Sequence, residues 1–293
     1  MKITPTGQTL GAAIEDIDLN TPVSDTDFRT ILRALGQYGV LCFPGQDLSV
    51  EAHAAFGARF GQLDVNVASS LAHEPGHPEM MILSNMVKDG KAVGLHDAGQ
   101  DWHTDMSYAK TIALANILHA RAVPTRHGKP LGETQFRNMH AAYDDLPDDL
   151  KHRLEGRTAT HDFNKYWEIA LGRPGTVRKP LTPEQRAKRP PVSHPICMTH
   201  PITGRKVLYA DPGYTMWIDG MDRVESDMIL DFLFRHQTRL EYAYAHHWAV
   251  GDVLMWDNIG TVHYAVADYL PGEDRYMRRV QVMATLDYPA LAA

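Results

Sequence analysis

Apolar residues recur at helical spacing near the beginning of the chain. The repeating positions are Phe28, Ile31, Leu32 and Leu35. A spacing of three to four residues places them on one face of a helix. Ser24 followed by Asp27 resembles a capping box at the start of this helix, and Gly39 is a typical residue at its end. The pattern therefore predicts a helix between Ser24 and Gly39.

Short apolar runs bounded by turn residues predict strands along the rest of the chain. These runs cover residues 40–43, 112–123, 206–209, 240–244, 253–256 and 279–286. Further helices are predicted at residues 49–60, from Pro147 to Gly156, and around residues 227–236. The order of elements favours an antiparallel β-sandwich, hence a mainly β fold with peripheral helices.

Residues 161–195 differ from their surroundings because they combine tryptophan, tyrosine, many basic residues and several prolines. Such a composition resists regular structure and predicts a long loop. Loops of this kind often cover active sites. Since neither a repeat nor a change in composition divides the chain, we expect residues 1–293 to form a single domain with an active-site loop at 161–195.

Composition narrows the choice of partners. Of the 293 residues, 44% are hydrophobic and 22% are charged, and the net charge of −7 argues against a general nucleic-acid binder. Two cysteines are too few for a disulfide framework or a thiolate zinc site. The acidic residues near the N-terminus argue against a secretory signal, and no segment is long and apolar enough to predict a membrane span. We expect a cytoplasmic protein that acts on a small molecule.

His103 and Asp105 are candidate metal ligands because their spacing places both side chains on one face of an extended strand. A distant histidine would complete a two-histidine, one-carboxylate triad with open positions on iron. His263 is the candidate, since it follows an apolar strand and a turn. Taken alone, a His-x-Asp pair is more often structural or accidental than a metal site, and with sixteen histidines in the chain, His246 and His247 show how easily chance pairs arise.

Three arginines lie near the end of the chain, where apolar and polar residues alternate. Period two places Arg275 and Arg279 on one face and Arg278 on the other. Two guanidinium groups on one face could grip acidic groups by planar, bidentate hydrogen bonds. The alternative is a solvated basic strand.

Several motifs together resemble the family of taurine dioxygenase and 2,4-dichlorophenoxyacetate dioxygenase. They are Trp102-His103-Thr104-Asp105, Gly132-Glu133-Thr134, Met255-Trp256-Asp257-Asn258, His263-Tyr264-Ala265, Asp268-Tyr269-Leu270-Pro271 and the arginine pair. Their order and approximate spacing match the family, and the resemblance runs along nearly the whole chain. It implies a double-stranded β-helix, or jelly roll, with iron at the open end of the barrel.

The resemblance also implies site residues and cosubstrates. His103, Asp105 and His263 match the family's Fe(II) ligands, and no catalytic residue beyond the iron centre is expected. Thr134 and Arg275 match the pair that anchors 2-oxoglutarate, which reacts with O₂ in this family. Arg279 matches an arginine that meets the substrate's anionic group, although one residue is inserted between His263 and the arginines.

The expected substrate pocket departs from that of the taurine enzyme. Asn66, Ser69 and Gly99 replace three polar contacts. Tyr166 and Trp167 stand where the taurine enzyme has a serine and a phenylalanine, and Tyr214 replaces another phenylalanine. We expect these three residues to contact the substrate together with Asn66 and Arg279. These aromatic side chains could form a wall with one hydroxyl handle, or pack beneath the loop. Arg279 favours a carboxylate, sulfonate, sulfate ester or phosphonate, and taurine is disfavoured.

Two other classes stay open at this point. A non-catalytic metal-binding jelly roll would keep the ligands without needing Thr134 or Arg275. A zinc-dependent hydrolase would use the triad without a 2-oxoglutarate clamp. The expected partner is a small organic acid, with neither nucleic acid nor membrane, and a homo-oligomer is left open.

Overall fold

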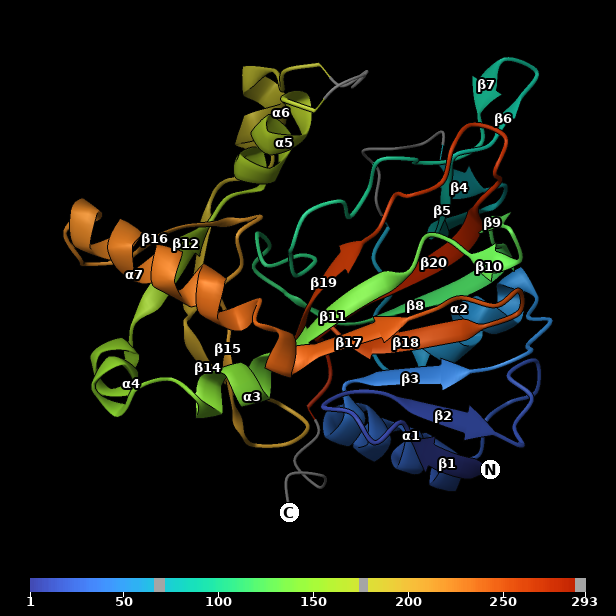
Figure 1. The fold of residues 1–293 in the computed structure, drawn as a ribbon, viewed down its shortest axis with the longest axis horizontal. Coiled ribbons are helices and arrows are strands. Elements are labelled where there is room, and N and C mark those ends of the chain that lie inside the picture. The colour runs from blue at the N-terminus through green and yellow to red at the C-terminus, as the bar shows by residue number, and fades with distance from the viewer. Residues whose placement is uncertain (66–71, 174–178, 288–293) are drawn as a thin grey trace.

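The computed structural model of the protein describes residues 1–65, 72–173 and 179–287. Within these residues the largest sheet has eight strands, and all neighbouring strands are antiparallel except β2 and β3. In spatial order the strands are β1 (Lys2–Pro5), β2 (Ala12–Glu15), β3 (Val40–Phe43), β18 (Val253–Asp257), β8 (Ala113–Ala122), β20 (Tyr276–Met283), β5 (His77–Ser84) and β4 (His73–Glu74). Figure 1 shows this sheet in the right-hand part of the molecule.

A three-stranded sheet packs against one face of the large sheet. Its strands, in spatial order, are β17 (Ala243–His246), β11 (Thr134–Asn138) and β19 (Thr261–Ala265). The ring of Phe136 on β11 lies 5.6 Å from that of Trp256 on β18, inside a buried apolar cluster that includes Leu118 on β8 and Met277 on β20. The two sheets therefore face each other across a shared core, as in a β-sandwich.

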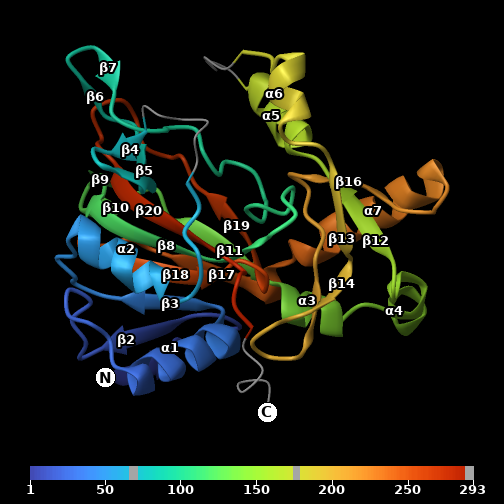
Figure 2. The same cartoon turned by 180° about the vertical axis from the view of Figure 1, so that it is seen from behind.

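The other face of the large sheet is covered by helices α1 (Asp25–Tyr38) and α2 (Val50–Ala58). Figure 2, seen from behind, shows both helices in front of the sheet. Strand β8 is buried on both faces, since Ile117 joins the core under the helices and the next residue, Leu118, joins the core between the sheets. This explains why its sequence is an unbroken apolar run, and the strand predicted at residues 112–123 is confirmed.

The ends of the first two helices follow from their capping residues. The Ser24 hydroxyl accepts a hydrogen bond from the Asp27 amide at 3.1 Å, and Gly39, with φ of 67°, donates its amide to the Leu35 carbonyl. Ser49 caps α2 in the same way through the Ala52 amide. A side-chain cap of this kind stabilises a helix by about 1 kcal/mol. Both predicted helices are confirmed.

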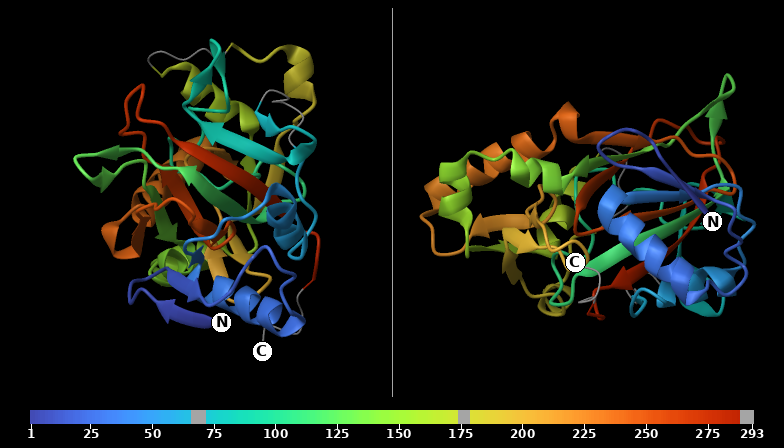
Figure 3. Two further views of the ribbon diagram at one scale, coloured as in Figure 1. Left: turned by 90° about the vertical axis from the view of Figure 1, so that its right-hand side faces the viewer. Right: turned by 90° about the horizontal axis from the view of Figure 1, so that it is seen from below.

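An outer layer extends from one end of the sandwich. Its elements are α3 (Met139–Asp144), α4 (Asp148–Leu154), β12 (Thr158–His161), β13 (Val192–Pro195), β14 (Cys197–Thr199), β15 (Lys206–Leu208), β16 (Thr215–Ile218) and α7 (Arg223–Gln237). Strands β13, β12 and β16 form a sheet, and β14 pairs with β15. The view from below in Figure 3 separates α7, in orange, from α1, in blue.

The prediction that residues 161–195 form an irregular loop is wrong. This stretch contains the end of β12, helices α5 (Phe163–Leu171) and α6 (Pro183–Ala187), and strand β13. Asp162 caps α5 through the Asn164 amide, and Thr182 forms a capping box with Gln185 around the first turn of α6. These caps stabilise two short helices that the basic, proline-rich composition of the stretch does not predict. Residues 174–178 of the stretch lie outside the described residues.

Three element boundaries also differ from expectation. Leu240–Tyr242 is a 3₁₀ helix, so that strand β17 begins at Ala243. Strand β20 begins and ends three residues earlier than predicted, and its pairing with β8 is irregular near both ends.

Small hairpins are formed by β6 (Val87–Lys88) with β7 (Lys91–Ala92) and by β9 (Thr125–Arg126) with β10 (Lys129–Pro130). Across the described residues, no helix has both the length and the apolar character needed to span a bilayer.

Candidate active site

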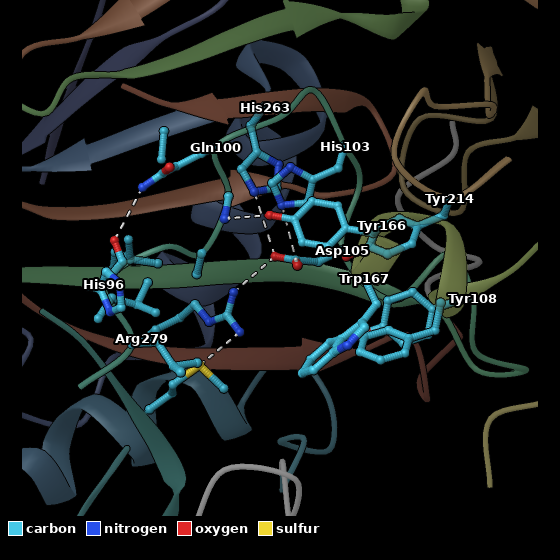
Figure 4. A pocket seen from close by; sticks show the side chains of 18 of the residues that line it. His96, Gln100, His103, Asp105, Tyr108, Tyr166, Trp167, Tyr214, His263 and Arg279 are labelled. Atoms are coloured by element: carbon cyan, nitrogen blue, oxygen red, sulfur yellow. Dashed lines mark hydrogen bonds and ion pairs between the residues drawn. The ribbon is translucent and has the colours of Figure 1, made fainter. Parts of the chain in front are cut away.

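His103, Asp105 and His263 converge at one end of the space between the sheets (Figure 4). His103 and His263 are joined by two backbone hydrogen bonds of 3.1 and 2.9 Å, which bring their segments together across 160 residues of sequence. One oxygen of Asp105 lies 3.7 Å from Nε2 of His103, and the other lies 3.7 Å from Nε2 of His263. All three side chains are buried.

Asn258, in the turn after β18, fixes the position of Asp105. Its Nδ2 donates to the Asp105 carbonyl at 2.8 Å, and its Oδ1 accepts from the Asp105 amide at 3.2 Å. The same Oδ1 accepts from Nδ2 of Asn116, whose Oδ1 accepts from Nε2 of Gln281. A chain of three buried amides therefore ties the Asp105 segment to β18, β8 and β20. Sequence reasoning assigned no role to Asn258, although the residue stands in the recognised Trp256-Asp257-Asn258 motif.

Hydrogen bonding and burial both act on the three side chains. Nδ1 of His103 lies 2.7 Å from the Asp101 carbonyl, which can only accept, so Nδ1 donates there and Nε2 is the ring nitrogen that faces Asp105. Burial and the nearby His103 lower the pKa of His263 well below 6.5. Burial opposes ionisation of Asp105, but Arg279 and the two imidazoles together hold its pKa below the ordinary value. Two imidazoles and one carboxylate form a donor set that fits a divalent transition metal.

Arg275 and Arg279 both line the cavity beside this cluster, whereas Nε of Arg278 points away and donates to Glu74 at 2.6 Å. The structure thus has the alternation that the sequence predicted. Nη1 of Arg279 donates to Asp105 Oδ2 at 3.2 Å, and its Nη2 lies 3.3 Å from the sulfur of Met81. Arg279 is therefore already paired with a carboxylate.

Arg275 has no such partner. Its side chain is only 6% exposed, its Nε makes no hydrogen bond, and no carboxylate among the described residues forms an ion pair with it. Gly132 makes room for it, since a Cβ there would lie 3.1 Å from Nε of Arg275. Thr134, on the same cavity wall, accepts from Nε1 of Trp248 and keeps its own hydroxyl proton to donate. A buried cation of this kind requires a charged partner, and a ligand carboxylate held by Arg275 and Thr134 fits.

The cavity has a volume of about 690 Å³ and an aromatic wall on the side away from the sheets. Tyr166, Trp167 and Tyr214 all line it, together with Tyr108 and Phe163. Tyr166 stacks on Tyr214 with centroids 5.3 Å apart. The Tyr166 hydroxyl accepts from the Gly99 amide at 3.0 Å. Tyr166 thus belongs to the wall, while its hydroxyl anchors the chain just before the metal cluster.

Some predicted and some unpredicted residues remain to be placed. Asn66, the other expected contact, and Ser69 lie outside the described residues. Cavity residues that sequence reasoning missed include Tyr108, Phe163, Gln185, Lys188 and Arg189. The last three belong to the stretch predicted to cover the active site, but nothing in the sequence singled them out from the other polar residues of that stretch. Tyr108 follows Asp105 by only three residues.

His246, which resembled a candidate ligand in sequence, has a different partner. Its Nε2 lies 3.1 Å from Asp252 Oδ2, which also accepts the amide of Ala249 and so closes the turn before β18. This pair lies outside the cavity. The neighbouring His247 is exposed and pairs with Glu133. His246 is as buried as His263, so its place outside the cavity is what separates it from His263, and sequence alone could not show this.

Comparison with known proteins identifies the family. Residues 2–281 match the family described as taurine catabolism dioxygenase TauD, TfdA family. The chain is 34% identical to pentalenolactone F synthase of Streptomyces arenae over 99% of its length and 97% of that protein. It is 36% identical to the alpha-ketoglutarate-dependent 2,4-dichlorophenoxyacetate dioxygenase of Cupriavidus pinatubonensis, over 86% and 87% of the two chains.

A comparison with solved structures supports the same family. The crystal structure of AAD-2 in complex with Mn(II) and N-oxalylglycine covers 98% of both chains with 28% sequence identity and a TM-score of 0.79. The double-stranded β-helix implied by the sequence motifs is confirmed by this match. The chain therefore belongs to the TauD/TfdA family of alpha-ketoglutarate-dependent dioxygenases.

Proposed function

We propose that this dioxygenase uses Fe(II), 2-oxoglutarate (alpha-ketoglutarate) and O₂ to hydroxylate a small anionic organic substrate, with release of succinate and CO₂. The observation that carries this proposal is the buried, unpaired Arg275, which lies with Thr134 in the same cavity as the cluster of His103, Asp105 and His263. One cavity thereby offers a metal-binding cluster and a clamp for a carboxylate.

His103, Asp105 and His263 would hold the iron. Iron bound there supplies O₂ activation, which no side chain of the cavity can provide. Asp105 favours hydroxylation over halogenation, because related halogenases lack this carboxylate and use its place for chloride. Asn258 supports the reaction indirectly by holding both the amide and the carbonyl of Asp105.

Arg275 and Thr134 would hold the distal carboxylate of 2-oxoglutarate. The guanidinium offers planar, charge-assisted hydrogen bonds, and the hydroxyl, already fixed by Trp248, offers one more. Without these partners, the distal carboxylate of 2-oxoglutarate would lose its hydration inside the protein, and this loss would oppose binding. This clamp is the feature that neither a metal-storing jelly roll nor a zinc hydrolase needs.

The cavity favours an acid that carries apolar surface. Among the described residues that line it, one carboxylate, Asp105, faces four cationic side chains, which are Lys188, Arg189, Arg275 and Arg279. Its aromatic wall would bury an aryl or alkyl group, at about 25 cal/mol per Å² of apolar surface removed from water. The similar dichlorophenoxyacetate dioxygenase is named for an aryloxy acid of this kind. Taurine fits less well, because its ammonium group would meet this cationic and aromatic surface.

Succinate release with a panel of acids tests the proposal. The purified protein is given Fe(II), ascorbate, O₂ and 2-oxoglutarate with taurine, aryloxyacetates, longer alkyl carboxylates and aryl sulfonates. We expect an aryl or longer alkyl acid to give the highest kcat/KM, and Arg279→Ala to impair turnover of that acid more than binding of 2-oxoglutarate. If taurine proves the best substrate, the argument from the cavity wall is wrong.

The same assay separates the other two classes. A zinc-dependent hydrolase would form product without O₂ and without 2-oxoglutarate. A metal-binding protein without catalysis would bind Mn(II) but release no succinate with any acid. We expect product only when O₂ and 2-oxoglutarate are both present.

A further inference from the structure

Arg189 reaches the cavity from the side opposite the sheets. It follows α6, and its amide donates to the Arg186 carbonyl at the end of that helix. The guanidinium carbon lies 4.4 Å from the centroid of the Phe163 ring and 5.5 Å from that of Tyr108. Both rings also line the cavity. The guanidinium therefore packs against the aromatic wall at cation–π distance, and a guanidinium in such a contact still offers N–H groups to an acid.

Arg189 has no carboxylate in ion-pair contact among the residues that the structure describes. Asp64 feels the charge of Arg189, but Asp64 lines a small neighbouring recess and not the cavity. Arg279, by contrast, is paired with Asp105. Burial raises the pKa of Tyr108 to about 12, and among nearby charges Arg189 opposes that rise most. The positive charge of Arg189 is thus felt inside the cavity and is not compensated there.

The charges of the expected contents do not change this imbalance. Fe(II) carries two positive charges and 2-oxoglutarate carries two negative charges, so their binding together adds no net charge. The excess of cationic side chains over Asp105 in the cavity is therefore unchanged. Even with Arg275 in contact with the distal carboxylate of 2-oxoglutarate and Arg279 with Asp105, Arg189 and the exposed Lys188 have no carboxylate partner among the described residues. An uncompensated cation beside an apolar wall attracts an anionic group that also carries apolar surface.

We propose that Arg189 determines substrate specificity by pairing with the acidic group of an amphipathic organic acid whose apolar body lies against Phe163 and Tyr108. This inference rests on the proposed function and adds an anion-binding point that the family resemblance did not include. The substrate would be oriented with its acidic group near the end of α6 and its apolar part directed toward the cavity interior. An elongated aryl or alkyl acid could pair with Arg189 and still extend along the wall toward the cavity interior, whereas a compact acid held at Arg189 would cover less of the wall.

Equilibrium binding tests the inference without relying on turnover. The full-length protein is loaded with Mn(II) and N-oxalylglycine and titrated by calorimetry with aryloxyacetates, aryl sulfonates and long-chain alkyl carboxylates, each beside its uncharged amide. We expect Arg189→Met to weaken the best acid at least tenfold and to change binding of its amide less than twofold, because methionine keeps apolar contact with the rings but removes the charge. Arg189→Lys should recover part of the loss.

Arg186→Met is the matched control. Arg186 lies three residues earlier, pairs with Glu168 and does not line the cavity, so its loss changes net charge equally without touching the proposed site. Equal losses for acid and amide in Arg189→Met would show that Arg189 only packs the wall. If Arg189→Met binds the acid as tightly as the wild-type protein and Arg279→Met binds it more weakly, the inference is overturned. The proposed function would stand in that case. If the wild-type protein prefers no acid over its amide, the anionic-substrate proposal itself fails.

Discussion

The two sides of the cavity are held together by different interactions. On the sheet side, backbone hydrogen bonds join His103 to His263, and buried amides fix Asp105. On the other side, the wall consists of packed aromatic rings from separate segments. The centroid of the Tyr214 ring lies 4.7 Å from that of Tyr108 and 5.3 Å from that of Tyr166. Directional hydrogen bonds define atomic positions, whereas ring stacking tolerates small displacements.

This difference corresponds to two tasks. Metal ligands and a cosubstrate clamp need positions fixed to a fraction of an ångström, which strands of a paired sheet provide. A wall that selects substrates needs shape and apolar surface, and helical segments outside the sheet can change these without disturbing the ligands. We therefore expect substitutions on the sheet side to affect every substrate, and substitutions on the aromatic side to affect some substrates only.

The largest expected effect is that of Asp105→Ala. Removing the only carboxylate of the cluster should weaken Mn(II) binding more than about 100-fold, because changes at residues that merely support a metal ligand already cost about 10- to 100-fold. Calorimetric titration with Mn(II) measures this. Asp252→Ala, which breaks the carboxylate–imidazole pair outside the cavity, should lower the melting temperature but leave Mn(II) affinity unchanged. Near-normal affinity in Asp105→Ala would remove this residue from the metal site.

Arg275→Leu should have the next largest effect. Loss of a buried charge partner costs about 2–5 kcal/mol, so 2-oxoglutarate should bind at least about 30-fold more weakly while Mn(II) binding survives. Arg278→Leu is the matched control on the same segment, since Arg278 faces Glu74 and lies outside the cavity. Titration of the Mn(II)-loaded variants with 2-oxoglutarate compares the two. If only Arg278→Leu lost affinity for 2-oxoglutarate, Arg278 and not Arg275 would be the residue that binds the cosubstrate.

Trp167→Ala should have the smallest effect and should depend on the substrate. The indole is half-buried and lines the cavity, so its loss should raise KM of a bulky aryl acid about five- to tenfold, equivalent to about 1 kcal/mol of apolar burial. Affinity for 2-oxoglutarate should not change. Trp217→Ala, on β16 and outside the cavity, controls for a general loss of packing. An equal rise in KM for bulky and compact acids would contradict the division between the two sides.

Sequence patterns predicted the parts of the protein that depend on local rules. Ser24 and Gly39 mark the ends of α1, and the apolar run at residues 112–123 marks β8, because capping and burial act on neighbouring residues. The metal cluster required more, since His103 and His263 are distant in sequence and meet only through sheet pairing. The family motifs supplied that long-range information.

The aromatic side was harder to predict for a physical reason. Helices α5 and α6 are short, and their stability depends on caps at Asp162 and Thr182 and on packing rather than on a long periodic pattern. Arg189 lay in a run of basic residues, where no local signal distinguishes a cavity-facing side chain from a solvated one. Similarly, Asn258 supports Asp105 through amide groups whose partners are more than 100 residues away.

The chain of buried amides has a consequence for removal of the metal. Gln281, Asn116 and Asn258 link β20, β8 and the turn after β18 to the backbone of Asp105, so the position of Asp105 depends on the paired strands. These hydrogen bonds do not in turn require a bound metal. We therefore expect chelators to remove the metal without unfolding the sheets.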